Sequence, residues 1–117
     1  MEKGACIILT SVETESDGLK LAKGIVEEGL AACVQLSASG KSIYCWQGEL
    51  QCTNEYYLSI KTTEAASEAA VAWLKQHHPY ETAEILRISA ESNRAYLKWM
   101  RATTPLLSKS STQSGTD

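Results

Sequence analysis

The distribution of apolar residues predicts three short strands outside the centre of the chain. Residues 5–10 and 30–36 form nearly continuous apolar runs, which are typical of buried strands. Residues 84–89 alternate weakly between polar and apolar side chains and also predict a strand. These strands are too far apart along the chain to pair through simple turns, so helices are expected between them.

The central stretch, residues 42–62, predicts a long β-hairpin with its turn at Gln47-Gly48. Aromatic and β-branched residues fill both arms, and Gly48 supplies the positive φ that a tight turn needs. The turn sets the opposed pairs, which are Trp46 with Glu49, Cys45 with Leu50, Tyr44 with Gln51, and Ile43 with Cys52. One face is then apolar enough for a core and carries Ile43, Cys45, Leu50 and Cys52. The other face is aromatic and polar, suits a surface that meets a partner, and carries Tyr44, Trp46, Glu49 and Gln51.

The first amphipathic helix is predicted between Thr14 and Gly29. Thr14 has capping-box spacing to Asp17, and Gly29 is typical of the residue that follows a helix. Apolar residues between them recur at helical spacing. The expected buried stripe is Leu19, Ala22, Val26 and Leu30, widened by Leu21 and Ile25.

Two further helices are predicted in the second half of the chain. The Ala-rich segment 64–76 follows Thr63 as N-cap and has high helix propensity, and Pro79 stops it. A short helix at 94–101 follows Asn93 as N-cap. Both carry apolar residues at helical spacing, so both are expected to pack on a sheet.

The predicted order of elements is strand, helix, strand, strand, helix, strand and an extra helix. This order indicates an α+β fold of the ferredoxin-like type, with two split βαβ halves around an antiparallel sheet. A long hairpin is not stable alone, so the rest of the chain or another copy must cover it. We expect one domain over residues 1–103 and a flexible Ser/Thr-rich tail over 104–117.

Composition excludes several classes of protein. The chain has 117 residues and a net charge of −3, which argues against a nucleic-acid-binding surface. No apolar run is long enough to span a membrane. The first residues lead directly into a strand-like run without a basic segment, so no signal peptide is predicted and a cytoplasmic location is expected.

The four cysteines show no Cys-x-x-Cys pair, which weakens a zinc-ribbon interpretation. Cys6, Cys33, Cys45 and Cys52 all lie in strand-like apolar runs. In a reducing compartment this pattern favours four buried thiols over disulfides. Cys45 and Cys52 share one hairpin face, which leaves a soft-metal pair as an alternative.

The segment His77-His78-Pro79-Tyr80-Glu81 holds both histidines of the chain. Imidazole is a common ligand for zinc, copper and nickel, which makes these residues metal-site candidates. Two adjacent histidines point in different directions on a regular helix, so a shared ion would need the helix end broken by proline, or two subunits. The structural alternative is that one histidine caps the helix and the other packs.

An enzymatic hypothesis would use Glu81 or Glu84 as a base, a histidine as an acid and Cys33 as a nucleophile. Reactive thiols need an electropositive and partly exposed setting, whereas Cys33 lies in an apolar strand. No enzymatic activity is therefore predicted.

Five segments together resemble the CutA family of divalent-cation tolerance proteins. They occur in the family's order, extend over nearly the whole folded part, and are Ile25–Val34, Ser42–Leu50, Ile60–Thr63, His78–Ile85 and Tyr96–Trp99. The resemblance implies a ferredoxin-like subunit in a tight homotrimer, whose long hairpin strands pair between subunits. It also implies interface positions at Tyr44, Trp46, Tyr56 and Leu58. The trimer is similar in architecture to the PII signalling proteins, which gives a signalling or interaction module as an alternative function.

The resemblance also implies a function and its candidate residues. The family is associated with tolerance to copper and other divalent cations, so a non-enzymatic protein that binds such an ion weakly is expected, with His77 and His78 as ligands. Some members have a thiol where this chain has Thr10, which argues against a copper(I)-type site. The matched polar residues are expected to line a cleft between subunits, and they are Cys33, Lys61, His78, Tyr80, Glu81 and Glu84.

Overall fold

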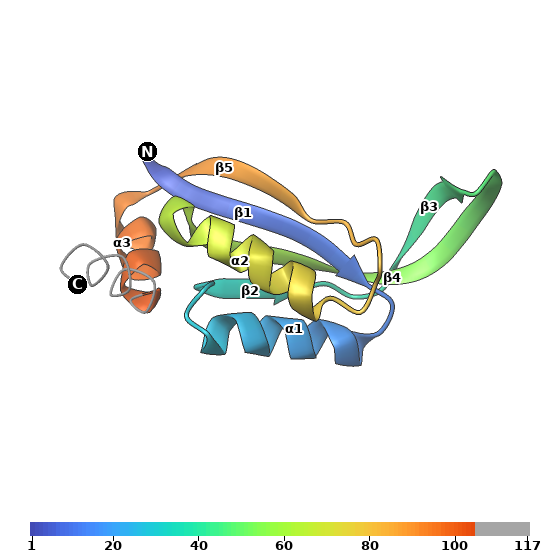
Figure 1. The fold of residues 1–117 in the computed structure, drawn as a ribbon. Coiled ribbons are helices and arrows are strands. Elements are labelled where there is room, and N and C mark those ends of the chain that lie inside the picture. Colours follow the sequence, from blue (N-terminus) through green and yellow to red (C-terminus); the bar gives the residue numbers. More distant parts are fainter. Residues whose placement is uncertain (105–117) are drawn as a thin grey trace.

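An antiparallel sheet with strand order β2-β4-β1-β5 forms one layer of the computed structural model, which describes residues 1–104. β3 pairs with the N-terminal part of β4, and these two strands form a hairpin that extends the sheet (Figure 1). The elements are β1 (Glu2–Val12), α1 (Glu15–Glu27), β2 (Cys33–Leu36), β3 (Gly40–Trp46), β4 (Glu49–Thr63), α2 (Glu64–His77), β5 (Leu86–Ser92) and α3 (Arg94–Thr103). This mixed α+β fold has the predicted order, with two interleaved βαβ units.

Helices α1 and α2 form the second layer and cover one face of the sheet (Figure 1). The core between the layers is built on Ile8 and Ile60, which are fully buried and face each other across β1 and β4. Leu21 and Ile25 of α1 and Leu74 of α2 complete it. Burial of such aliphatic side chains contributes about 1.5–3 kcal/mol each, so this cluster carries much of the stability of the chain.

The buried stripe of α1 differs from the predicted one. Leu19 and Val26 are each 41% exposed, whereas Leu21 and Ile25 are buried. Gly18 sets this rotation, because a Cβ at that position would lie 2.8 Å from a methyl group of Leu36. The close approach of helix to strand thus selects the Leu21 face over the other apolar face.

The register predicted for the hairpin is confirmed. Trp46 pairs with Glu49, and the three pairs beyond them follow as expected. Gln47 and Gly48 have φ values of 50° and 82°, the positive φ at both positions that a type I′ turn requires.

The hairpin projects away from the rest of the fold, so its apolar face is uncovered (Figure 1). Ile43 is 69% exposed and Leu50 is 78% exposed. Cys45 and Cys52, on the same face, are also exposed. The expectation that this face contributes to a core is therefore wrong for the single chain, as is the expectation of four buried thiols.

The sheet face opposite α1 and α2 is covered at one end, where α3 packs on it, and we call the uncovered remainder the open face. Ile7 pairs with Ile88, and Leu9 pairs with Leu86, on the side of β1 and β5 away from the core. Side chains alternate along a strand, so these four lie opposite the buried Ile8. Leu86 is 54% exposed and Ile88 is 46% exposed. The chain thus leaves a continuous apolar strip on its sheet.

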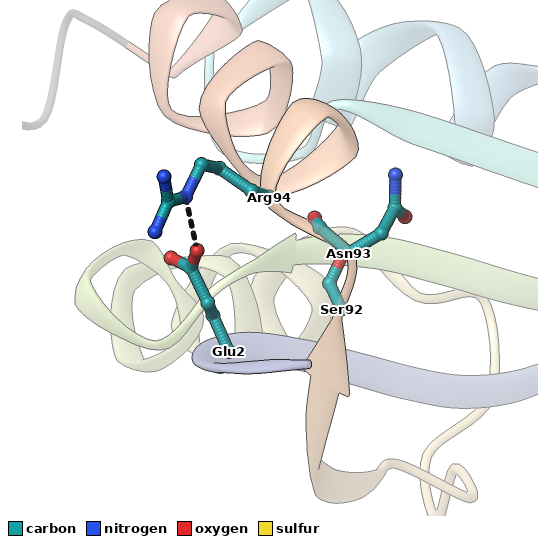
Figure 2. Close-up of polar contacts among 4 residues, drawn as sticks. All are labelled: Glu2, Ser92, Asn93 and Arg94. Atoms are coloured by element: carbon teal, nitrogen blue, oxygen red, sulfur yellow. Dashed lines mark hydrogen bonds and ion pairs between the residues drawn. The ribbon is translucent and has the colours of Figure 1, made fainter.

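Helix α3 closes the end of the sheet that is far from the hairpin (Figure 1). Leu97 and Met100 are buried there. Asn93 occupies the predicted N-cap position, and its side chain makes no capping bond there. Arg94 Nε instead donates to Glu2 Oε2 over 2.6 Å and joins α3 to the start of β1 (Figure 2). The Arg94 side chain is 87% exposed and that of Glu2 is 38% exposed, so this ion pair is reached by water and contributes little.

The predicted tail begins one residue too early. Thr104 is buried, and its hydroxyl donates to the carbonyl of Met100 over 3.2 Å. It therefore belongs to the end of α3, and the rest of the predicted tail, 105–117, lies outside the described residues. No helix within residues 1–104 is long and apolar enough to cross a membrane.

Candidate functional site

A groove of about 950 Å³ lies where the hairpin joins the rest of the fold. Its walls come from the end of β1, from both hairpin strands and from the segment between α2 and β5. The lining residues are Ser11, Glu13, Ser42, Ile43, Tyr44, Trp46, Gln47, Thr53, Glu55, Tyr80, Glu81, Thr82 and Glu84. Four of them are glutamates and three are aromatic. The groove is therefore acidic and aromatic at the same time. We call it the acidic groove.

Tyr80 and Glu55 make a polar contact in the wall of the groove. The Tyr80 hydroxyl donates to Glu55 Oε2 over 2.8 Å. Burial, and then this bond to a carboxylate, raise the pKa of Tyr80 above its usual value, so the phenol stays neutral. Glu55 was not among the predicted residues. In the sequence Glu55 follows the polar residues Thr53 and Asn54 and precedes two tyrosines, so nothing in the local pattern indicated that this carboxylate is buried.

His78 lies at the back of the groove, buried between β1 and the end of α2. Its Nδ1 accepts from the backbone N–H of Tyr80 over 3.1 Å, and Nε2 lies 2.9 Å from the carbonyl oxygen of Ser11 and 3.0 Å from the Thr10 hydroxyl. A backbone N–H can only donate and a carbonyl can only accept, so the proton is on Nε2. Burial lowers the pKa of His78, which favours this neutral form.

These bonds leave no ring nitrogen of His78 free to bind a metal. Binding through Nδ1 would break the bond from Tyr80, and binding through Nε2 would require loss of its proton. The residues present therefore do not fit a metal held jointly by His77 and His78. His78 is therefore the histidine that packs within the fold, as in the alternative to a metal site given by the sequence.

His77 points elsewhere and is exposed. Its ring stacks on Trp73, with the ring centroids 4.1 Å apart, and Nδ1 lies 2.9 Å from the carbonyl oxygen of Trp73. Because that carbonyl can only accept, the proton lies on Nδ1 and the lone pair on Nε2. His77 thus offers one nitrogen to a ligand, and no group of three or more His, Cys, Asp or Glu side chains within residues 1–104 is placed to hold an ion.

The six residues expected in one cleft fall into two groups. Tyr80, Glu81 and Glu84 line the acidic groove, and His78 belongs with them because it is bonded to Ser11 and Tyr80 of its wall. Cys33 of β2 and Lys61 of β4 are opposed residues in the sheet and form the second group. The Lys61 ammonium group donates to Gln35.

The second group lies near α3, because the backbone N–H of Ala32 donates to the carbonyl of Lys61 and Ala32 packs with α3. A single chain therefore does not bring Cys33 and Lys61 to the acidic groove. A nucleophilic role for Cys33 beside Glu81 or Glu84 has no support in one chain.

The four expected interface residues also separate into two groups. Tyr44 and Trp46 line the acidic groove and are partly exposed. Tyr56 and Leu58 belong to the face of β4 under the helices, where Leu58 is 1% exposed and Tyr56 packs against the core. Leu58 therefore has almost no surface to offer another subunit, and the apolar surface available lies on the open face and on the apolar face of the hairpin.

Comparison with known proteins places this geometry in a family context. Residues 6–103 match the family model of the CutA1 divalent ion tolerance protein. The divalent-cation tolerance protein CutA of Thermus thermophilus is 41% identical over 99 residues, covering 84% of this chain and 96% of that protein. The CutA of Yersinia pestis strain Pestoides F is 34% identical, with coverage of 84% and 83%.

Solved structures agree with this match. The structure of CutA from Synechococcus elongatus superposes with a TM-score of 0.82 at 37% identity and covers 86% of this chain and 90% of that one. CutA1 from Ehrlichia chaffeensis gives a TM-score of 0.84 at 25% identity, with coverage of 89% and 98%.

Proposed function

The chain belongs to the CutA1 family of divalent ion tolerance proteins, and on this premise we propose that it is a non-enzymatic homotrimer that binds a divalent cation, copper being the ion expected. Binding is weak and serves tolerance or sensing. The observation that carries the proposal is the open face, because a soluble subunit does not keep such a strip of apolar side chains in water.

Assembly of copies explains two uncovered surfaces at once. Ile7, Leu9, Leu86 and Ile88 on the open face, and the apolar face of the hairpin, would be buried against neighbouring subunits. β2 and β5 are the edges of the main sheet, and an edge next to an apolar surface pairs readily with another chain. The resemblance to a trimeric family sets the expected number at three.

A metal site completed between subunits is consistent with the donors of one chain. His77 presents a free Nε2 at the end of α2, and the acidic groove presents carboxylates. Imidazole suits copper and zinc, and carboxylates suit harder ions. Neither set is complete in one chain, so ligands from a second copy are required. The assembled protein would bind the ion and release it again, and we assign no reaction to the ion.

Native mass spectrometry tests this proposal. The purified protein is titrated with Cu(II) and with Zn(II), beside His77→Ala and His78→Ala variants. We expect a trimer that takes up a fixed number of ions per subunit, and we expect His77→Ala to lose them while folded His78→Ala retains them. A trimer without stoichiometric uptake would overturn the metal role, and a monomer would overturn the assembly.

A second candidate function is a signalling or interaction module that binds a ligand at the acidic groove. Its specific support is the groove itself, which is large enough for a small molecule and has polar groups among aromatic walls. If this alternative is correct, His77→Ala leaves function intact, whereas the double variant Tyr80→Phe/Glu81→Gln abolishes it. Growth of a deletion strain complemented with each variant under copper excess distinguishes the two.

A further inference from the structure

β2 and β3 pair with the same strand, β4, but an extra residue interrupts the pairing between them. The last pair of β2 is Leu36 with Leu58, and the first pair of β3 is Gly40 with Glu55. Between these pairs three residues, 37–39, stand opposite only two residues of β4. We call residues 37–39 the bulge. One extra residue bends the strand that contains it and increases the local twist.

The side chain of Ser37 holds the bulge on β4. The backbone N–H of Ser37 donates to the carbonyl of Tyr57 over 2.9 Å, and Ser37 Oγ accepts from the backbone N–H of Tyr57 over 3.0 Å. The same hydroxyl donates to the carbonyl of Ala38 over 2.9 Å. A side-chain oxygen thus takes the place of a backbone carbonyl in the ladder, so specific bonds determine the course of the bulge.

The ring of Tyr57 covers the point where the chain enters the ladder again. A Cβ at Gly40 would lie 2.6 Å from Cε2 of Tyr57. Only glycine leaves room for the ring in this position. Tyr57 therefore contacts both ends of the bulge, Ser37 through its backbone and Gly40 through its ring.

Beyond the bulge the hairpin turns away from the sheet and from α1 (Figure 1). No element among residues 1–104 covers its apolar face, where Ile43 is 69% exposed and Leu50 is 78% exposed. A two-stranded hairpin is not stable in water alone, so its cover must come from outside the chain. The bend therefore determines the direction in which the hairpin can find that cover.

We propose that the bulge is an assembly device that aims the hairpin at a second copy of this chain. Ser37 and Tyr57 are the positioning residues that hold its angle. This inference rests on the proposed homotrimer and is independent of the metal site. A ring of identical subunits closes only when each subunit meets the next at one fixed angle, so a straightened hairpin misses its place on the neighbouring copy.

Deletion of Ala38 separates the bend from the rest of the fold. Two residues would then stand opposite two, and the alternation of side chains would run through the ladder without a break. Every paired residue of β2 and β3 keeps its face and its partner on β4. The subunit is therefore expected to fold normally, and only the angle of the hairpin changes.

Sedimentation velocity of the full-length protein tests the proposal. The wild-type protein is expected to be a trimer, and the variant that lacks Ala38 is expected to be dissociated at the same concentration. Circular dichroism and urea unfolding check that the subunit is folded. Ala38→Gly is the matched control, because it changes the same residue but keeps the bulge three residues long, and it is expected to assemble normally.

A second pair of variants tests the bond that holds the bulge. Ser37→Ala removes the acceptor of the Tyr57 N–H and is expected to weaken assembly by about three- to tenfold, the equivalent of one hydrogen bond. Ser39→Ala makes the same change at an exposed neighbour in the bulge and is expected to assemble normally.

Three outcomes would overturn the inference. A normal trimer of the variant that lacks Ala38 would do so and would leave the proposed assembly intact. Equal weakening by Ser37→Ala and Ser39→Ala would show that the bond to Tyr57 does not hold the angle. A monomeric wild-type protein would overturn the proposed assembly and this inference together. If the deletion variant does not fold, the comparison of Ser37→Ala with Ser39→Ala decides.

Discussion

The imidazole of His78 and the hydroxyl of Thr10 lie 3.0 Å apart, although 68 residues separate them in the chain. With the carbonyl of Ser11, this contact ties the end of α2 to the end of β1. His78 is thereby a structural residue, and its polar atoms are satisfied within the fold. The exposed His77 is the histidine that remains available to a ligand.

His78→Ala is expected to destabilise the chain by about 2–3 kcal/mol, because buried hydrogen bonds to Ser11, Thr10 and Tyr80 are lost and their partners are left buried. His77→Ala is the matched control. It removes an exposed ring stacked on Trp73 and should cost less than about 1 kcal/mol. Urea unfolding at one fixed protein concentration measures both, and equal losses would contradict the assigned roles.

Stability should fall on acidification because of His78. Burial holds its pKa below the usual value, and the Ser11 carbonyl and the carboxylates of Glu55 and Asp17 oppose this only in part. The folded state therefore binds the proton more weakly than the unfolded state. The stabilisation is complete above the unfolded pKa of about 6.5 and is lost as the pH falls through the folded pKa.

The measurement for this pH effect is the free energy of unfolding between about pH 7 and about pH 5. We expect a steeper decline for the wild-type protein than for His78→Gln, which has no ring to protonate. Parallel curves for the two proteins would show that other groups cause the decline.

Ile88→Lys is expected to dissociate the assembly without unfolding the subunit. Ile88 lies on the open face and is 46% exposed, so a lysine there is tolerated in one chain but places a charge in a buried interface. Val26→Lys on α1 is the control, because Val26 is 41% exposed but lies on the helical layer. Sedimentation velocity distinguishes the two, and a trimer in both variants would remove the open face from the interface.

Gln47→Asn should stabilise the hairpin turn by about 0.5 kcal/mol, because Asn adopts positive φ more readily than Gln in a type I′ turn. Gln51→Asn makes the same chemical change on a strand and should give no gain. Hydrogen exchange of the hairpin amides reports the effect. Faster exchange in Gln47→Asn would show that the turn conformation does not limit hairpin opening.

The sequence by itself determined the elements and the hairpin register. Alternation of side chains and the Gln47-Gly48 turn act over a few residues, so the opposed pairs follow from local rules. The order of strands and helices also follows from local patterns, and this order indicated the split βαβ topology. The caps at Thr14 and Thr63 are also local, and both side chains accept the expected backbone N–H.

The tertiary structure alone decided which apolar and polar groups are buried and which side chains meet. Leu19 and Leu21 are equally apolar, and the close packing at Gly18 selects Leu21. The environment of His78 depends on Thr10 and Ser11, and the buried charge of Glu55 depends on Tyr80. These contacts join residues far apart in the chain, and their free energies depend on desolvation, which only the packed fold determines.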